Sequence, residues 1–560
     1  MNQPPSESRL PSALPSKETL MMEFKSDRER LSDRELVESL VGLANASGGE
    51  LFLGVEDDGT PTGLHQIHLN LDGLPAMVAN MTRPPLHVQV EALDIGGTPI
   101  ARIHLARSRH LVATSDGRVV RRRIREDGQP ENVPVYPEEF LSRKADLGAL
   151  DYSALPMESA SLADLDPLER SRLRQMIERY RGDQALLPLQ DDELDGALGL
   201  VQSLEGRRIP TVAGLLLVGK ATSLSTLLPS HEVAFQVMEG TDIRVNRIER
   251  WPLLRWFEHV EEQFEVRYRE EEMASGLFRV PVPNFDRRAF REAFVNALVH
   301  RDYTRLGMVR VLWESDGIRI SGPGGFPDGV TQTNLLTTDP TPRNPRLADA
   351  LKRIGLAERS GRGVDRIFEG LIRFGRMAPD YGGSTSTSVA VTLFGGQADL
   401  DFLRVVLGEE KRRGVPLSLD ALIVMSFLRH ERRAGVGELA LAVQRPEAST
   451  RSILERLVEI GLLEAHGSTR DRSFTLGGRI YREMGQSSAY VRQTGVEVIH
   501  HEAMVLKLVK TKGSIKRSDV IDLCGLTPGQ SKTLLGRLVQ QGHLEMLGQK
   551  RGTIYRLKMG

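Results

Sequence analysis

The sequence predicts a multidomain protein of mixed α/β and α+β class. Its 560 residues exceed the roughly 250–300 residues at which a single hydrophobic core stops growing. Strand-like and helix-like patterns alternate up to about residue 400, and the remaining residues form two similar helix-rich modules. The composition, 40% hydrophobic and 27% charged, excludes a fibrous or wholly disordered protein.

Shifts in composition predict the domain boundaries. The polar, proline-rich residues 1–16 are expected to be disordered. The predicted parts that follow are an N-terminal α+β domain (17–145), a linker with one helix (146–190), a central α/β domain (191–400) and two C-terminal modules (401–485 and 496–560).

The N-terminal domain is expected to open with a strand and a helix. Ser32 precedes the helix as an N-cap, with Glu35 completing a capping box, and Gly48-Gly49 ends it. Alternating β-branched residues predict the strands. The elements in chain order are a strand at Thr19–Lys25, a helix at Asp33–Ala46, and strands at Glu50–Glu56, His87–Glu91, Ile100–Leu105 and Val119–Ile124.

The linker and the central domain also alternate helices and strands. The continuous apolar run Ala213–Val218 is interpreted as a buried strand. The other predicted helices are Asp166–Tyr180, Trp251–Glu271, Arg287–His300 and one after Gly363, and the other strands are Val309–Glu314, Gly317–Ser321 and Ser388–Leu393.

Gly214 to Lys220 has nearly the spacing of a P-loop. Ala221, however, stands where a Ser or Thr would bind Mg²⁺. The sequence therefore offers no helicase motor.

The sequence favours a reducing, aqueous compartment. Cys524 is the single cysteine, which excludes a disulfide framework and a cysteine-based zinc site. No run approaches the ~18 consecutive apolar residues of a membrane helix, and the N-terminus lacks the apolar core of a signal peptide. We expect a soluble cytoplasmic protein without membrane contact.

The net charge of −1 does not indicate a partner, but the distribution of charge does. Residues 497–560 contain 11 Lys and Arg against 5 Asp and Glu, and a second basic run spans Arg118 to Arg125. Such patches are typical of nucleic-acid surfaces, although ordinary solvated faces have the same composition.

Each C-terminal module is predicted to contain three helices and a strand pair with a basic tip. The third helices are Glu447–Ile460 and Pro528–Gln541, the latter capped by Thr527. This is the winged helix-turn-helix pattern, which docks on DNA or on proteins. The residues expected to contact nucleic acid are Arg451, Arg470 and Arg472 in the first module and Gln530, Ser531, Lys532, Arg537, Lys550 and Arg551 in the second.

Three N-terminal carboxylates could gather around a metal. Glu18 and Glu23 bracket one short strand, and Asp57 follows another at a turn. A hard divalent cation takes oxygen ligands and can activate water against a phosphodiester. Spacing alone favours the other interpretation, surface carboxylates around a β-turn.

The same segment resembles the Schlafen AlbA-like domain. The resemblance covers roughly residues 16–145 and is carried by Glu18-Thr-Leu-Met-Met-Glu-Phe-Lys25, Leu43-Ala-Asn-Ala-Ser-Gly-Gly49, Gly54-Val-Glu-Asp-Asp-Gly59 and Gly63. Some members are metal-dependent endoribonucleases, and many prokaryotic relatives are DNA-binding or regulatory. It implies Glu18, Glu23 and Asp57 as catalytic residues and ligands of Mg²⁺ or Mn²⁺, and Lys25, Arg121, Arg122, Arg123 and Arg125 as phosphate contacts.

The predicted helix Arg287–His300 carries a second polar pattern. Glu292, Asn296 and His300 are spaced i, i+4, i+8 and share one face. Such a helix can hold Mg²⁺ through the Asn carbonyl while Glu orients a water. Glycines downstream permit close approach of a phosphate.

This region, about residues 285–372, resembles the GHKL ATP-binding fold in its RecG-helicase-like C-terminal variant. The resemblance includes Asp302, Ser321-Gly-Pro-Gly-Gly325, Pro342-Arg-Asn-Pro345 and Glu358 to Gly363. It implies ATP binding by Glu292, Asn296, His300, Asp302, Gly322, Gly324, Gly325, Gly361 and Gly363, with Asn296 on the metal. The Asp that reads adenine in the family is missing from the glycine box, which leaves a scaffold kept for packing or dimerisation as the alternative.

Three functions follow. The first is a nucleic-acid-binding regulator with an ATP-binding domain and DNA-binding winged helices. The second is a metal-dependent endonuclease acting on RNA or single-stranded DNA, as in defence against phage. The third is a nucleotide-gated homo-oligomer. The expected partners are DNA, RNA or both, and further copies of the chain.

Overall fold

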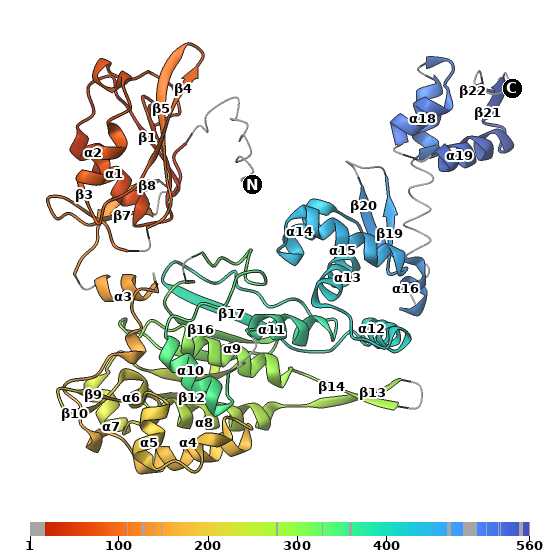
Figure 1. Ribbon diagram of the computed structural model, residues 1–560. Helices are drawn as coiled ribbons and strands as arrows, with labels where there is room; N and C mark the ends of the chain where they lie inside the picture. Colours follow the sequence, from red (N-terminus) through yellow and green to blue (C-terminus); the bar gives the residue numbers. More distant parts are fainter. Residues whose placement is uncertain are drawn as a thin grey trace. The chain divides into compact units, whose positions relative to one another are not determined.

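The computed structural model describes most of the chain (Figure 1). The residues described are 17–108, 110–125, 129–137, 139–146, 148–275, 278–327, 329–357, 361–467, 472–484, 501–510, 512–524, 526, 528–547 and 553–558. The chain divides into two compact units, Met1–Leu155 and Pro156–Gly560.

The first unit is built on a four-stranded sheet in the order β1-β2-β5-β4, in which β1 and β2 are parallel and the other pairs antiparallel. A buried cluster between α1 and the sheet forms its core. The bounds of its principal elements are β1 Met22–Lys25, α1 Asp33–Ala44, β2 Gly49–Leu53, α2 Leu74–Asn80, β4 Gln89–Ile95, β5 Thr98–Leu105, β7 Val120–Ile124, β8 Pro130–Pro134 and α3 Glu139–Asp146.

The ends of α1 follow from its sequence. The Ser32 hydroxyl accepts the Glu35 N–H at 3.2 Å, which confirms the predicted N-cap. Gly48 and Gly49 adopt φ of 70° and 136°, a region that glycine enters without steric cost. Between them and the helix, buried Asn45 bonds the carbonyls of Val112 and Val120, so this residue has a structural role.

The second unit contains a five-stranded sheet in the order β12-β11-β15-β16-β17. Helix α9 contacts β15, β16 and β17, and α11 packs against α9 (Figure 1). The bounds of the principal elements here are α4 Pro167–Arg179, α5 Asp191–Ala197, β9 Val201–Leu204, β10 Arg207–Pro210, α6 Val212–Val218, α7 Ala221–Leu227, β11 Val233–Glu239, β12 Asp242–Glu249, α8 Leu253–Arg267, β13 Glu270–Ser275, β14 Phe278–Pro283, α9 Arg287–Val299, β15 Val309–Trp313, β16 Gly317–Pro323, α10 Pro345–Ile354, α11 Gly363–Ile372 and β17 Ser388–Phe394.

The predicted strand Ala213–Val218 is wrong, because these residues belong to helix α6. All seven residues of α6 are buried, so the run has no polar face from which a helical period could be recognised. The Thr211 hydroxyl, which accepts the Gly214 N–H at 3.1 Å, caps this helix and is the sequence signal that the apolar run obscured.

The two C-terminal modules share three helices followed by a strand pair. The first contains α12 Leu400–Arg413, α13 Leu419–Glu431, β18 Ala434–Gly435, α14 Val436–Val443, α15 Glu447–Glu459, β19 Leu463–His466, β20 Ser473–Leu476 and α16 Gly478–Glu483. The second contains a helix over 501–510, α18 Arg517–Cys524, α19 Pro528–Gln540, β21 Leu544–Leu547 and β22 Ile554–Leu557. The first module has in addition α12 before the shared set, the short strand β18 within it and α16 after it. Leu534, Leu535 and Leu538 are buried, as their helical spacing predicted. Thr527, the predicted cap of the last helix, lies outside the described residues.

Across the part of the chain that is described, every helix is too short or too polar to cross a bilayer.

Candidate functional site

Helix α9 lines a pocket with the face that the sequence singled out. Asp286 caps the helix by accepting the Ala289 N–H at 2.8 Å. One turn apart, Glu292, Asn296 and His300 all line a cavity of about 410 Å³. This volume lies within the roughly 300–1,000 Å³ of small-molecule sites.

The rest of the pocket comes from β16, β17, α10, the start of α11 and a loop without regular structure. We call residues 329–342 the pocket loop. Eight consecutive residues of this loop, Leu335 to Pro342, line the cavity. Of the predicted glycines, Gly322, Gly324, Gly361 and Gly363 line it as well, whereas Gly325 does not appear in the lining.

Glu292 is held close to the start of α11. Its side chain is 7% exposed, and a Cβ on Gly363 would collide with its carboxylate. Tyr381 lies near it in the same lining; desolvation, followed by the negative charge of Glu292, raises the pKa of the phenol. Tyr381 therefore remains a neutral hydrogen-bond donor beside the carboxylate.

The glycines are explained by contacts within the protein. Gly363 leaves room for Glu292, and a side chain on Gly325 would meet the backbone of Ser386. Gly324 adopts φ of 102°, which disfavours any side chain. Phosphate approach is therefore not needed to account for these three positions.

Asp302 does not line the pocket. Its side chain is 2% exposed; one oxygen lies 3.0 Å from Arg305 Nε and 3.4 Å from Arg343 Nη1. Asp302 Oδ1 also accepts the Thr304 N–H at 3.0 Å. Because each of its oxygens is engaged, Asp302 holds the turn after α9 and is not placed to bind a nucleotide directly.

The Pro342-Arg-Asn-Pro345 segment connects the end of α9 to the glycine segment that follows β16. Asn344, which is 1% exposed, donates 2.8 Å bonds to the carbonyls of Val299 and Arg301. The Val299 carbonyl is at the end of α9, where carbonyls lack helical partners, and Arg301 follows just after the helix. Arg343 donates to the Gly325 carbonyl at 2.9 Å. The motif therefore fixes α9 against the glycine segment.

Several pocket residues were missed at the sequence level. Lys352 in α10 lines the cavity, as do Asp339 of the pocket loop and Asp365 of α11. Burial raises the pKa of Asp365 above its ordinary value. No local pattern marks Lys352, because it reaches the cavity only through the packing of α10 against α9.

The residues fit a nucleotide that is bound with a divalent cation. Glu292, Asp339 and Asp365 would repel a bare triphosphate, and Lys352 offers one ammonium group. An Mg²⁺ ion would neutralise part of the phosphate charge, with the Asn296 amide oxygen as a suitable ligand. Among the described residues, no group of three or more His, Cys, Asp or Glu side chains is placed to hold a metal by itself. The phosphates would therefore have to supply part of the coordination.

His300 and His231 both remain neutral near pH 7. Desolvation lowers the pKa of each imidazole to about 4. His231 is fully buried, and its Nε2 lies 2.8 Å from the Trp251 carbonyl oxygen. His231 therefore donates to that carbonyl in its neutral form.

We expect acid to destabilise the protein through His231. The unfolded residue takes up a proton near pH 6.5, whereas the folded one does so only near pH 4. Between these values the unfolded state binds more protons, so the free energy of unfolding falls as the pH drops, by about 3 kcal/mol for this residue. Urea denaturation between pH 7 and 4 measures the slope. His231→Gln retains an N–H donor and should flatten it; equal slopes in both proteins would contradict the assignment.

In the first unit, Glu18 and Glu23 converge on Arg122. Arg122 Nη1 donates to Glu23 Oε2, and its Nη2 lies 3.3 Å from Glu18 Oε2. The Arg122 side chain is 2% exposed and that of Glu23 is 3% exposed. Burial raises the pKa of Glu18, opposed by the Phe24 N–H bond and by Arg122. A guanidinium thus occupies the position between the two carboxylates.

Asp57 is not part of this cluster. It lies in an exposed turn after β2. The neighbouring Glu56 is the better-anchored carboxylate, because it accepts bonds from Ser26 at 2.8 Å and Thr62 at 2.6 Å. These hydrogen bonds hold the pKa of Glu56 below its ordinary value.

The predicted phosphate contacts of the first unit differ in accessibility. Arg122 is buried and ion-paired, so it is not placed to reach a phosphate. Arg121 pairs with Glu139 at 2.9 Å, Arg123 with Glu131 at 2.7 Å and Lys25 with Glu23 at 3.1 Å. Arg125 is exposed. The free basic surface is therefore smaller than the sequence predicted.

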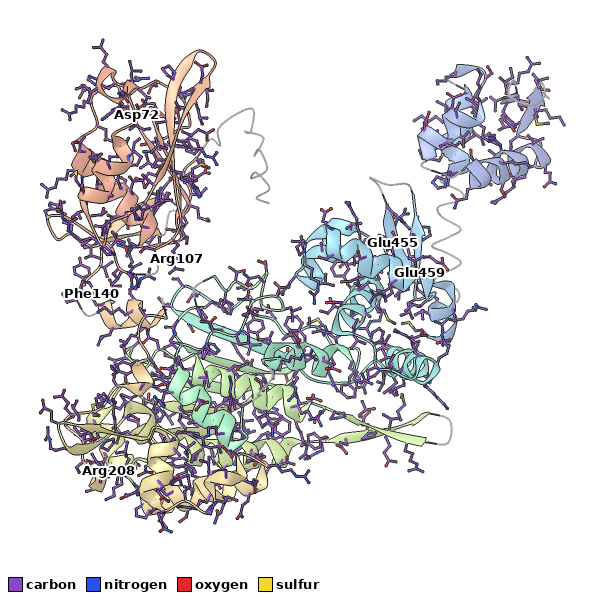
Figure 2. The ribbon with its side chains drawn as sticks, viewed as in Figure 1. Asp72, Arg107, Phe140, Arg208, Glu455 and Glu459 are labelled. Carbon is purple, nitrogen blue, oxygen red and sulfur yellow. The ribbon has the colours of Figure 1, made fainter. Side chains whose placement is uncertain are left out.

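The third helices of the two modules differ in charge. In α15, Arg451 pairs with Glu447 at 3.0 Å, and Glu455 and Glu459, which Figure 2 labels in this module, add negative charge. Arg472 pairs with Glu455 at 2.7 Å. Helix α19 contains no acidic residue and carries Lys532 and Arg537.

The second module exposes most of the predicted contacts. Gln530 and Lys532 are exposed, and Arg537, with a side chain 41% exposed, lies 3.5 Å from Glu502. The prediction that Ser531 faces outward is wrong, because it is 0% exposed; it lies one turn before Leu534 and Leu535, on the helix face that packs inward. Arg470, Lys550 and Arg551 fall outside the described residues.

Comparison with protein families matches two of these regions to known domains. Residues 18–131 match "Schlafen, AlbA_2" and residues 307–393 match "Putative ATP-dependent DNA helicase recG C-terminal". Residues 140–234 match a domain of unknown function. The first two matches confirm the predicted Schlafen AlbA-like and RecG C-terminal-like domains and indicate a nucleic-acid-related, ATP-binding protein. The second match begins after α9 and so does not cover Glu292, Asn296 or His300.

Among solved structures, the crystal structure of the DIP2311 protein from Corynebacterium diphtheriae is 24% identical, with a TM-score of 0.49; the alignment covers 96% of this chain and 95% of that chain. No curated protein matches the chain.

Proposed function

Since a Schlafen AlbA-like domain and a RecG C-terminal-like ATPase domain occur in one chain, we propose that the protein is a nucleic-acid-binding regulator that binds ATP with Mg²⁺. ATP would occupy the pocket beside α9, and the second C-terminal module would contact duplex DNA as a winged helix. Assembly into a homo-oligomer and a cytoplasmic location remain predictions.

The α9 pocket is the observation that carries the proposal. It gathers the carboxylate, amide and imidazole of Glu292, Asn296 and His300 along one helix face in a cavity of about 410 Å³. In this arrangement Asn296 would hold the metal and Glu292 would orient a water toward the phosphate. Lys352 would meet the phosphate charge directly. Apolar lining residues such as Ile320 and Val391 suit a nucleobase.

The charge of α19 supports DNA contact by the second module. Lys532 and Arg537 lie five residues apart on a helix without acidic residues, and Lys510, Lys516 and Arg517 are exposed elsewhere in the module. Neutralising phosphates with such cations releases counterions and supplies most of the affinity for a duplex. In the first module, Arg451 of α15 and Arg472, just before β20, pair with glutamates at 3.0 and 2.7 Å, closer than the 3.5 Å between Arg537 and Glu502. The first module is therefore a poorer candidate.

We expect the double substitution Lys532→Ala and Arg537→Ala to weaken binding of the full chain to duplex DNA roughly tenfold or more. The slope of log affinity against log salt should fall by about 2, since each cation neutralises about one phosphate. Fluorescence anisotropy of a labelled duplex at several salt concentrations measures both quantities.

The matched control for this experiment is Arg451→Ala with Arg456→Ala on α15. This pair removes the same charge from the equivalent helix of the first module and should change neither affinity nor slope. A larger effect from the control than from the α19 pair would contradict the proposal, because it would place the DNA-binding surface on the first module.

A metal-dependent nuclease is less well supported. Two of its three carboxylates, Glu18 and Glu23, share the guanidinium of Arg122, and the third, Asp57, lies in a separate exposed turn. The nuclease hypothesis would be supported if the protein cleaved labelled RNA or single-stranded DNA with Mn²⁺ and if Glu23→Ala abolished this cleavage.

A further inference from the structure

The first C-terminal module is docked on the central domain and contacts the pocket loop. Gln444 ends α14 and directs its side-chain amide to this loop. Its Oε1 accepts the Leu336 N–H at 2.9 Å, and its Nε2 donates to the Gln332 carbonyl at 3.0 Å. A single side chain thus bonds both a donor and an acceptor of the loop backbone.

The same contact continues through apolar side chains. Leu336, Val364 and Tyr381 all line the pocket. All three also pack against the buried core of the first module, which joins Phe368 and Ile372 of α11 to residues of α12 to α16. These three residues therefore belong both to the wall of the pocket and to the surface on which the first module packs.

Polar contacts fix the module in this position. Arg429 of α13 donates to the Gly375 carbonyl at 2.7 Å and pairs with Asp399, also at 2.7 Å. Arg373, just after α11, forms bonds to both carboxylate oxygens of Glu410 in α12. These contacts hold α12 and α13 against the central domain. Helix α14 packs on α13, so through Gln444 it can transmit the position of the module to the pocket loop.

The backbone of Gln444 indicates that its side chain is needed. The residue adopts φ of 56° and ψ of 39°, a left-handed conformation in which glycine is the usual helix terminator. A non-glycine residue there is strained, and such strain commonly marks a functional position. The two bonds to the loop offset that strain.

We propose that Gln444 is a positioning residue of the nucleotide site, through which the first C-terminal module holds the pocket loop closed over its ligand. This inference rests on the proposed binding of ATP in the pocket. By linkage, a ligand that contacts the loop must in turn stabilise the docked module. The module is then part of the nucleotide site, and DNA contact is left to the second module.

The test is Gln444→Gly in the full chain. Glycine relieves the left-handed backbone, so the module should fold at least as well as in the wild type. Without the amide, hydrogen exchange at the Leu336 N–H should accelerate roughly tenfold or more. The Kd for ATP with Mg²⁺, measured by isothermal titration calorimetry, should rise roughly fivefold to fiftyfold for the loss of two hydrogen bonds.

Arg432→Gly is the matched control, because among the described residues of this module Arg432 is the other non-glycine residue at positive φ, with φ of 61° at the end of α13. It should leave both the Leu336 exchange and the Kd unchanged. Unaltered exchange in Gln444→Gly would overturn the proposal, as would faster exchange with an unchanged Kd. If the wild type itself does not bind ATP, the proposed function fails, and the exchange data still decide whether Gln444 holds the loop.

Discussion

Replacing Arg122 with alanine is expected to destabilise the N-terminal unit by about 3–5 kcal/mol, because it leaves buried carboxylate charge without its partner. The guanidinium contacts both Glu18 and Glu23 and also donates to the carbonyls of Thr19 and Met22 at 3.1 Å. It therefore ties the segment before β1 to β7. Chemical denaturation of the full chain, followed at the transition of this unit, measures the loss.

Two further variants separate the buried charge from general damage. Arg121→Ala removes the neighbouring arginine, whose side chain is 28% exposed and paired with Glu139, and should cost at most about 1 kcal/mol. Adding Glu23→Gln to Arg122→Ala should recover part of the stability, since it removes one of the carboxylate charges that Arg122→Ala leaves without a partner. Equal losses for Arg121→Ala and Arg122→Ala would contradict the structural role of Arg122.

Replacing Asn296 with alanine is expected to weaken the binding of ATP with Mg²⁺ on the order of 100-fold, the upper range for a lost bond to a charged group. Asn296 lies between Glu292 and His300 on the pocket face of α9, and alanine retains the helix. The effect should therefore appear in binding and not in folding. Isothermal titration with ATP, with and without Mg²⁺, measures it.

Arg288→Ala is the control on the same helix, because Arg288 is exposed and lines a different groove. It should leave ATP binding unchanged. If Asn296→Ala and the wild type bind ATP with the same affinity at saturating Mg²⁺, the amide does not serve the metal. If neither protein binds ATP, the pocket is a packing feature of the fold, the alternative that the altered glycine box already suggested.

Local sequence signals predicted the helices that have a polar face. Helices α1 and α9 begin at the expected residues, Asp33 and Arg287. The cap at Ser32 was predicted, because a side-chain cap satisfies backbone N–H groups wherever the helix is placed. Helix α6 was missed because uniform burial removes the periodicity on which such predictions depend.

The residues of the candidate site likewise fall into those that the sequence could group and those that it could not. Glu292, Asn296 and His300 could be grouped from the sequence, since a spacing of four residues along one helix fixes their common face. Lys352, Tyr381 and Gln444 could not, because they come from other elements and reach the pocket or its loop only after these pack together. Glu18, Glu23 and Asp57 were predicted to gather around a metal; in the structure Glu18 and Glu23 contact Arg122, about a hundred residues further along the chain.

By itself, the sequence determined the fold class, the order of the two recognised domains and the polar face of α9, because caps, periodicity and motif spacing are local properties of the chain. Only the tertiary structure decided which charges are free and which are paired. Burial sets whether a carboxylate meets a metal or an arginine, and whether a lysine meets solvent or a pocket. The energy of a charge depends on neighbours that folding brings from distant parts of the chain.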